Sequence, residues 1–168
     1  MATRFQMSDL GALSYYLGIE VRQEKEAFTL GQSTYVSKLF EQSGMLSASL
    51  HTRLDIMFVV GYVNRFMEDL REDHWATVKR LLRYIKGTVD QGIVFPKTGR
   101  NRLQLTVFSD TDMTGDIDAW RSTSGVLIFL GSAPISWLSL KQKVVALFTC
   151  EADYVTAATT TCQAVWLR

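Results

Sequence analysis

The side chains of this sequence that could do chemistry are mainly carboxylates. Asp110, Asp112, Asp116 and Asp118 lie close together, and Asp153 follows within a segment of helical periodicity. Carboxylates are hard oxygen ligands of the kind that Mg²⁺ requires. Taken alone, however, such a cluster is more often a surface turn, because aspartate favours turns. A metal site and an aspartate-rich turn are therefore both open at this point.

Thiols and imidazoles offer no comparable site. If one helix contains Cys150 and Cys162, about 18 Å separates them, which is too far for a disulfide. Two cysteines with the distant His51 and His74 do not make a zinc pattern. We expect both thiols to be reduced and His74 to be a surface residue.

Basic residues form a second candidate surface. Lys79, Arg80, Arg83 and Lys86 recur along one predicted helix and could contact phosphates. A solvated helix face is favoured instead, because cations near the C-terminal end complement the helix dipole. The net charge of +1 provides no global attraction to nucleic acid. Binding to nucleic acid is therefore expected to be weak at most.

The composition is that of a folded domain. Hydrophobic residues make up 47% of the 168 residues and charged residues 21%, which is enough to bury a core. We expect Trp75, Trp137 and Trp166 to anchor that core rather than to stack on bases. No apolar run has the length that spans a bilayer, and the N-terminus lacks a secretory signal. The chain is therefore predicted to bind no membrane and to be intracellular, in the cytoplasm or the nucleus.

The first hundred residues alternate between strand-like and helix-like periodicity. The predicted elements are a hairpin over 15–32, helices over 33–42, 55–68 and 72–87, and a strand over 92–95. The apolar stripe of the third helix consists of Trp75, Val78, Leu82 and Ile85.

The last third of the chain predicts a small sheet with a helix. Strands are predicted over 103–108, 124–130 and 133–138, and a helix from about 147 to the end. The apolar stripe of that helix occupies positions 148, 152, 155, 159, 162 and 166. The predicted fold class is α+β, with an N-terminal hairpin and helices followed by a three-stranded sheet that the C-terminal helix backs.

Several short motifs resemble one family. They are Phe-Ser-Asp-Thr-Asp-Met-Thr-Gly-Asp at 108–116, Arg-Ser-Thr-Ser-Gly at 121–125, Ile-Ser-Trp at 135–137, Lys-Gln at 141–142 and Glu-Ala-Asp-Tyr at 151–154. In that order they resemble the polyprotein of copia-type LTR retrotransposons, where reverse transcriptase runs into ribonuclease H. Residues 7–21 are similar to the part of that reverse transcriptase just after its catalytic palm strands.

The resemblance implies three segments. Residues 1–52 correspond to a C-terminal remnant of reverse transcriptase, 53–100 to a helical connection, and 101–168 to a truncated ribonuclease H-like domain. Relative to the family, the chain is internally deleted near Thr52 and truncated at its C-terminus.

The resemblance also implies a metal site that is incomplete. Ribonuclease H cleaves the RNA strand of a hybrid with two Mg²⁺ ions held by carboxylates. The family places one carboxylate at Asp110 and a second, normally a glutamate, at Asp153. Aspartate draws that carboxylate back by roughly 1.5 Å, whereas metal distances tolerate only tenths of an ångström. Since the polymerase's catalytic Asp-Asp pair is also absent from the sequence, we expect no enzyme activity and no metal or other cofactor.

Two functions from different classes are compatible with these residues. The favoured one is a catalytically inactive protein-binding module, with a role in regulation or as one member of a selfish or antagonistic pair. It would bind a protein partner or form a homo-oligomer through one strand edge and the last helix. The interface residues expected are Leu103, Leu105, Val107, Val155, Cys162 and Trp166. The alternative is a residual or trans-completed magnesium-dependent ribonuclease H that acts on RNA–DNA hybrids.

Overall fold

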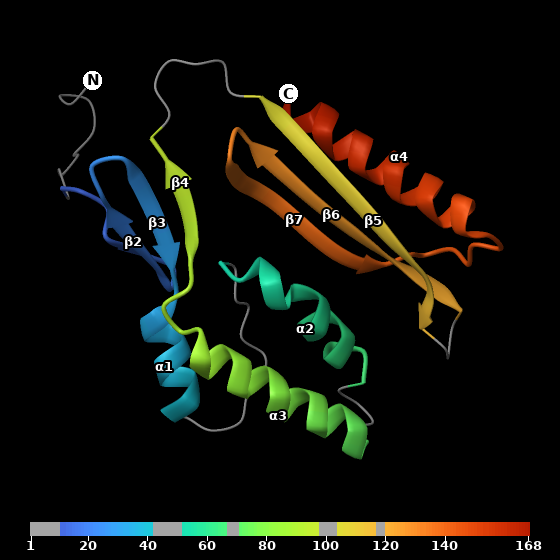
Figure 1. The fold of residues 1–168 in the computed structure, drawn as a ribbon, viewed down its shortest axis with the longest axis horizontal. Helices are drawn as coiled ribbons and strands as arrows, with labels where there is room; N and C mark the ends of the chain where they lie inside the picture. Colours follow the sequence, from blue (N-terminus) through green and yellow to red (C-terminus); the bar gives the residue numbers. More distant parts are fainter. Residues whose placement is uncertain (1–10, 42–51, 67–70, 98–103, 117–119) are drawn as a thin grey trace, which may run out of the picture.

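The chain folds into two antiparallel sheets with helices beside them (Figure 1). The computed structural model describes residues 11–41, 52–66, 71–97, 104–116 and 120–168. The predicted α+β class is confirmed. The predicted segment boundaries at 52 and 100 stay predictions.

The first sheet joins the N-terminal hairpin to a strand from much later in the chain. Its strands, in order, are β1 (Tyr15–Tyr16), β2 (Ile19–Gln23), β3 (Ala27–Gly31) and β4 (Ile93–Pro96). All neighbours are antiparallel, which confirms the predicted hairpin and the predicted late strand. A Cβ atom at Gly92 would collide with the carbonyl oxygen of Leu30, so only glycine fits where β4 approaches β3.

Three α-helices lie between β3 and β4 in the chain and share one core. They are α1 (Ser33–Glu41), α2 (Met57–Asn64), which follows the 3₁₀ turn η1 (Leu54–Ile56), and α3 (Glu72–Gly87). The buried residues that join them are Val36, Ile56, Leu81 and Ile85. The three predicted helices are confirmed, although α2 is shorter than predicted and positions 67 and 68 lie outside the described residues.

The inward face of α3 differs from the predicted stripe. Val78 and Ile85 are buried as predicted, but Leu81 shares their face and Leu82 is only half-buried. Trp75 is 49% exposed, so the prediction that it anchors the core is wrong. Since Leu81 fills the core position beside Ile85, the helix is rotated by about one residue relative to the predicted stripe.

The imidazole of His74 is buried rather than exposed, which corrects the prediction of a surface histidine. Its ring stacks on Phe66 with centroids 4.0 Å apart and meets the edge of Tyr62 at 6.2 Å. Its Nδ1 atom accepts the main-chain N–H of Arg71 at 3.3 Å, and this bond offsets part of the cost of burying a polar ring. His74 therefore connects the start of α3 to the end of α2.

The second sheet is built from the last third of the chain. Its strands, in order, are β5 (Leu105–Asp116), β6 (Arg121–Leu130) and β7 (Ala133–Lys141), and α4 (Thr149–Leu167) follows. The predicted three strands and C-terminal helix are confirmed, and each strand is longer than predicted.

The aspartates at 110 and 112 lie in a strand, so the alternative of an aspartate-rich turn is wrong for these two residues. Asp110 is opposite Gly125 and Asp112 is opposite Thr123 in the β5–β6 pairing. The carboxylate of Asp112 also accepts the main-chain N–H of Thr123. Cross-strand pairing outweighs the turn preference of aspartate here. Asp118 lies outside the described residues.

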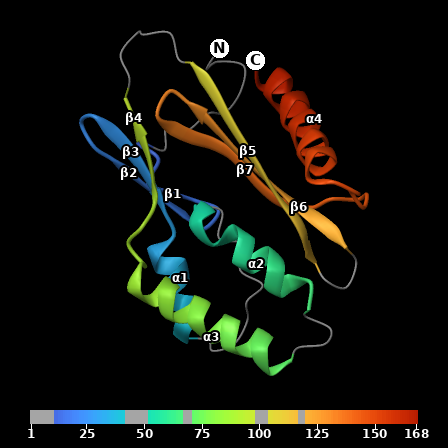
Figure 2. The same ribbon diagram turned by 45° about the vertical axis from the view of Figure 1, so that its right-hand side comes forward.

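The second sheet lies between helices on its two faces (Figures 1 and 2). On one face, the hydroxyls of Thr111 and Ser124 contact the Thr156 hydroxyl of α4 at 2.5 and 2.6 Å. On the other face, Arg65 at the end of α2 donates to the Thr123 hydroxyl at 3.2 Å. Strand side chains alternate, so every second residue of β5 points to the α4 face and the others to the α2 face.

Small residues form the packed face of α4, which corrects the predicted apolar stripe. Ala152, Thr156 and Thr160 are buried, whereas Phe148 and Trp166 are 66% and 82% exposed. The prediction that Trp166 anchors the core is therefore wrong. Alanine and threonine let the helix approach the sheet closely, and the threonine hydroxyls find partners there.

The N-terminus of α4 has no side-chain cap, because its N-cap residue is Phe148. We expect Phe148→Ser to raise the free energy of unfolding by about 1 kcal/mol, since a serine hydroxyl can accept a first-turn N–H. Urea denaturation measures the change. Leu147→Ser is the matched control, because it removes an exposed apolar side chain one residue outside the cap. Equal gains in both variants would mean that capping is not the cause.

Candidate interaction surface

The free edge of β5 is the first part of the candidate surface. Within the described residues, β6 is the only strand neighbour of β5. The carbonyl oxygen of Gln104 accepts the N–H of Gly131 at 2.8 Å, and bonded positions alternate along antiparallel strands. The main-chain groups of Leu105, Val107 and Ser109 therefore point away from β6. We call this row of donors and acceptors the β5 edge; it has the geometry that an added strand requires.

The side chains beside the β5 edge are partly apolar. Leu105 and Val107, both predicted interface residues, are half-buried on the α4 face. Phe108 on the α2 face is 56% exposed and meets the ring of Phe129 edge-on at 5.9 Å. Leu103, the third predicted residue of this strand, lies outside the described residues. Exposed apolar surface next to unpaired main-chain groups favours association.

Asp110 lies on the α2 face of β5 beside a shallow groove. The groove has a volume of about 260 Å³, and its walls include Leu54, Met57, Phe108, Leu127 and Trp137. The Asp110 side chain is exposed, and no hydrogen bond or ion pair joins it to another described residue. Its carboxylate is thus available to a ligand or a partner.

Asp153 lies on α4, on the other side of the second sheet from the groove. It is exposed on α4, on the opposite face of the sheet from Asp110. The two side chains thus extend from different sides of the second sheet, and the vestigial site at Asp110 and Asp153 stays a prediction. In the described parts of the chain, no group of three or more His, Cys, Asp or Glu residues could hold a metal ion. The lack of activity stays a prediction.

The outer side of α4 is the second part of the candidate surface. Val155 is half-buried, whereas Cys162 and Trp166 are exposed, and Tyr154 and Val165 are 76% and 68% exposed. Cys150 and Cys162 are unpaired, as predicted. A role for Val155, Cys162 and Trp166 in binding stays a prediction.

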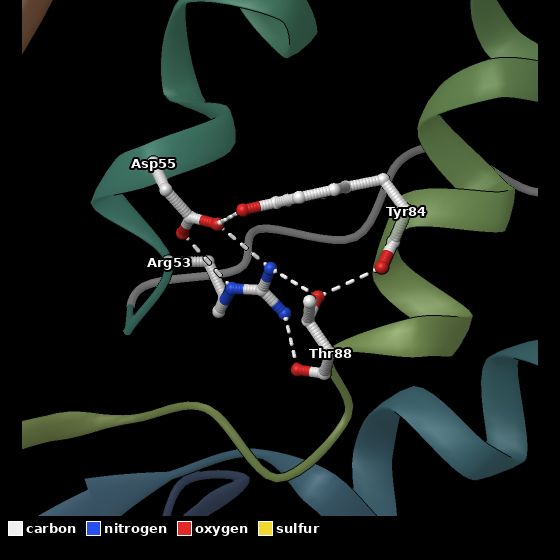
Figure 3. Close-up of polar contacts among 4 residues, drawn as sticks. All are labelled: Arg53, Asp55, Tyr84 and Thr88. Carbon is white, nitrogen blue, oxygen red and sulfur yellow. Dashed lines mark hydrogen bonds and ion pairs between the residues drawn. The ribbon is translucent and has the colours of Figure 1, made fainter.

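A buried arginine holds η1 against the end of α3 (Figure 3). The guanidinium of Arg53 donates from Nε and Nη2 to the two carboxylate oxygens of Asp55, at 2.9 and 2.8 Å. It also donates to the main-chain oxygen and the hydroxyl of Thr88, at 2.9 and 2.7 Å. The Tyr84 hydroxyl donates to Asp55 at 2.9 Å. We call these four residues the Arg53 cluster; sequence reasoning missed it.

The Arg53 cluster shifts the pKa values of its members. The hydrogen bonds from Arg53 hold the pKa of Asp55 below its ordinary value, despite partial burial of the carboxyl. The same bonds raise the pKa of Arg53 above its ordinary value. Donation to the Asp55 carboxylate raises the pKa of Tyr84, because a phenolate next to that carboxylate would lose the bond and be repelled. Asp55 is therefore ionised, and Arg53 and Tyr84 are protonated, at neutral pH.

Comparison with known proteins identifies the family of this chain. The family described as reverse transcriptase (RNA-dependent DNA polymerase) matches residues 1–54. The Pol polyprotein of transposon RE2 from Arabidopsis thaliana is 33% identical over 99% of this chain. The Pol polyprotein of transposon TNT 1-94 from Nicotiana tabacum is 30% identical over 100% of it. The chain belongs to the copia-type retrotransposon Pol polyproteins. It is similar to only 14% and 16% of the length of these two relatives, so it corresponds to a fragment of such a polyprotein.

A third relative of this copia-type fragment is of similar size. The secreted RxLR effector protein 161 of Plasmopara viticola is 40% identical over 69% of this chain and 80% of its own length. No solved structure matches the chain significantly. The predicted resemblance to copia-type polyproteins is thus confirmed, and the chain is retrotransposon-derived.

The Lys-Gln motif of this Pol fragment has a structural role at the start of α4. The amide nitrogen of Gln142 lies 2.9 Å from the carbonyl oxygen of Ala152. It lies 3.0 and 3.1 Å from the hydroxyls of Ser124 and Thr156. Gln142 is 5% exposed, so these bonds connect the end of β7, the middle of β6 and the first half of α4 inside the protein.

The basic residues of α3 lie on an open face. A depression of about 390 Å³ is lined by Glu72, Trp75, Ala76, Lys79, Arg80 and Arg83. The ammonium of Lys79 lies 5.5 Å from the centre of the Trp75 ring. This arrangement fits the predicted solvated face, and weak contact with phosphates stays the alternative. Among the described residues, no helix is long and apolar enough to cross a membrane.

Proposed function

We propose that this retrotransposon-derived chain acts as a catalytically inactive protein-binding module. The observation that carries the proposal is the β5 edge, where Leu105, Val107 and Ser109 direct unpaired main-chain groups outward beside the exposed Phe108. An extended segment can add to such an edge, with main-chain hydrogen bonds supplying affinity and side-chain contacts supplying specificity.

Two further features support binding rather than catalysis. Asp110 and Asp153 extend from different sides of the second sheet, which supports the expectation that the ancestral metal site is incomplete. The outer side of α4 adds the exposed rings of Tyr154 and Trp166 to the available surface. Large aromatic side chains are frequent anchors of protein interfaces.

The β5 edge can be blocked without disturbing the β5–β6 pairing. Ser109 is exposed and its N–H points away from β6, so Ser109→Pro removes an outward donor and places a ring on the edge. Ser109→Ala is the matched control, because it removes the hydroxyl and keeps the donor. Proteins retained from native cells would be purified, and their affinity for the wild type and for both variants would be measured directly.

We expect direct binding, either to one of these purified proteins or between copies of the chain. The affinity should fall at least tenfold in Ser109→Pro, because a strand-adding partner loses a main-chain bond and meets the proline ring. Ser109→Ala should bind as the wild type does. Absence of any direct binding, or equal binding by Ser109→Pro, contradicts the proposal.

The alternative function is a residual or trans-completed magnesium-dependent ribonuclease H. The exposed, unpartnered carboxylate of Asp110 is the feature that favours it. We expect purified protein with an RNA–DNA hybrid and Mg²⁺ or Mn²⁺ to show no cleavage above that of Asp110→Asn, since two-metal hydrolysis needs several converging carboxylates. Cleavage that disappears in Asp110→Asn would establish the alternative.

A further inference from the structure

Asp110 is the only charged residue among the described residues that line the groove beside it. The other walls are mainly apolar and include Met57, Leu127 and Trp137. The carboxylate is exposed, and no hydrogen bond or ion pair joins it to another residue in the part of the chain that the structure describes. A carboxylate beside apolar walls fits a side chain that combines an apolar stem with a positively charged head.

The pairing of β5 with β6 leaves room next to this carboxylate. Asp110 is opposite Gly125, which has no side chain, so the floor of the groove beside Asp110 is main chain. A Cβ atom at Gly125 would lie 3.7 Å from the carbonyl oxygen of Asp110, which is an ordinary contact, so packing does not fill this space. On this face α2 packs mainly against β7, at the far edge of the sheet. The rim of the groove at Asp110 is therefore open to a side chain from outside.

The geometry of the β5 edge brings one side chain of an added strand next to Asp110. The pairing of β5 with β6 is regular from Leu105 to Asp112, so its residues alternate without interruption over this stretch. Odd-numbered residues direct their main-chain groups outward, and the even-numbered residues therefore form the pairs without main-chain bonds, whose side chains lie closest. The residue of an added strand that is opposite Asp110 thus lies on the α2 face, beside the carboxylate and the groove.

Phe108 determines the chemistry of a second position of the added strand. It precedes Asp110 by two residues, lies on the same face, and is 56% exposed at the border of the groove. In an antiparallel strand, the residue opposite Phe108 follows the residue opposite Asp110 by two positions. An apolar side chain at that position would cover the exposed ring, since aromatic and apolar side chains stabilise cross-strand pairs.

We propose that the partner of the β5 edge is an extended protein segment in which an arginine or lysine precedes an apolar residue by two positions. The segment adds antiparallel to β5, as all neighbours in this sheet are, and it pairs its cation with Asp110 and its apolar residue with Phe108. This inference rests on the proposed function and names the chemistry of the partner. Arginine fits best, because its planar guanidinium matches a carboxylate and stacks on aromatic rings.

Two other occupants fit this surface less well. Asp110 and Asp112 lie on the same face of β5, so a nucleic acid strand placed along the β5 edge would bring its phosphates next to two carboxylates. Strand β5 itself contains no lysine or arginine, so pairing with a second copy of this strand brings no cation to Asp110. Charge complementarity therefore favours a basic segment of a different protein.

Selection from a phage-displayed library of random short peptides tests this motif, with the full chain as bait. We expect the enriched peptides to carry a cation two positions before an apolar residue. Their affinity, measured by fluorescence anisotropy on synthetic copies, should fall about fivefold in Asp110→Asn, because an opposite-charge pair across strands is lost. Asp90→Asn is the matched control, since it removes the same charge from an exposed residue between α3 and β4 and should leave the affinity unchanged.

Charge reversal tests whether the cation contacts Asp110 directly. Asp110→Lys should bind the selected peptides about tenfold more weakly than the wild type does, because like charges then oppose each other. A peptide in which glutamate replaces the cation should bind Asp110→Lys more tightly than it binds the wild type. A misfolded variant cannot gain affinity in this way. Enriched peptides without the cation, equal binding by Asp110→Asn, or no gain in the reversed pair overturns the inference.

The outcomes separate this inference from the proposed function. Peptides that lose affinity for Ser109→Pro but bind Asp110→Asn as they bind the wild type still add to the β5 edge, so the proposed function holds and the inference fails. A library that yields no binder, or only peptides that Ser109→Pro binds equally well, also overturns the inference. If, in addition, no protein from native cells binds the β5 edge, both fail.

Discussion

Replacing Arg53 with alanine should lower the free energy of unfolding by about 3 kcal/mol. The Arg53 side chain is 3% exposed and donates to Asp55 and Thr88 at four positions. Its removal leaves the Asp55 carboxylate without its cation and the hydroxyl oxygen of Thr88 without a donor, whereas the main-chain oxygen of Thr88 keeps the N–H of Gln91 at 3.2 Å. Since about a third of the Asp55 side chain is exposed, water compensates part of this loss, which places the effect at the lower end for a broken buried pair. Urea denaturation of both proteins measures it.

Two controls identify the cause. Tyr84→Phe removes one hydrogen bond to Asp55 at an exposed side chain, where water replaces the lost bond, so it should cost much less than Arg53→Ala. The difference between wild type and Arg53→Ala should also depend on pH. The pKa of Asp55 is lowered in the folded protein, so the stability that this pair contributes is present at neutral pH. It declines as pH falls below the ordinary carboxyl value of 3.8 toward the lowered pKa. The assigned role would be contradicted if the stability lost in Arg53→Ala did not shrink in acid, or if it were no larger than the loss in Tyr84→Phe.

Local periodicity was sufficient to predict most elements of this fold. The α3 range of 72–87 matches its predicted boundaries, because polar residues open the helix and Gly87 ends its apolar pattern. The three strands of the second sheet were predicted from alternation and from the Gly131 turn. Periodicity was insufficient for α4, because the predicted stripe assumed that large apolar residues face the sheet. The packed face consists of Ala152, Thr156 and Thr160, and the large residues Phe148 and Trp166 are exposed.

Contacts between distant positions explain what the sequence did not reveal. Arg53 bonds to Thr88, 35 positions away, and Tyr84 bonds to Asp55 over 29 positions. No local pattern signals such bonds. Asp110 lies in the first strand of the second sheet, two residues beyond the end of the predicted strand 103–108. Its position relative to Asp153 depends on which face of the sheet each element occupies. That information comes from packing, since a one-residue change of register moves a strand residue to the other face.

Gln142→Ala should be the second strongly destabilising change, at about 2 kcal/mol. The amide nitrogen of Gln142 reaches three acceptors, on Ser124, Ala152 and Thr156, at 2.9–3.1 Å inside the protein. An amide group has only two hydrogens, so no more than two of these bonds are strong at once. The amide oxygen of Gln142 is also buried without a partner among the described residues. Removing it relieves the free-energy cost of burying an unpaired polar atom and so offsets part of the loss. The net loss is therefore smaller than the sum of three bonds.

The matched control for this change is Gln163→Ala, because it also removes an amide that joins α4 to the second sheet. Gln163 donates to Ser136 at 2.6 Å, but its side chain is only half-buried, so water replaces the lost bond. Its substitution should cost less than about 1 kcal/mol. The two variants thus remove the same amide group, once from a buried position and once from a half-buried position. If Gln163→Ala costs as much as Gln142→Ala in urea denaturation, burial of the amide is not what makes Gln142 important, and the loss of side-chain packing against α4 is the remaining cause.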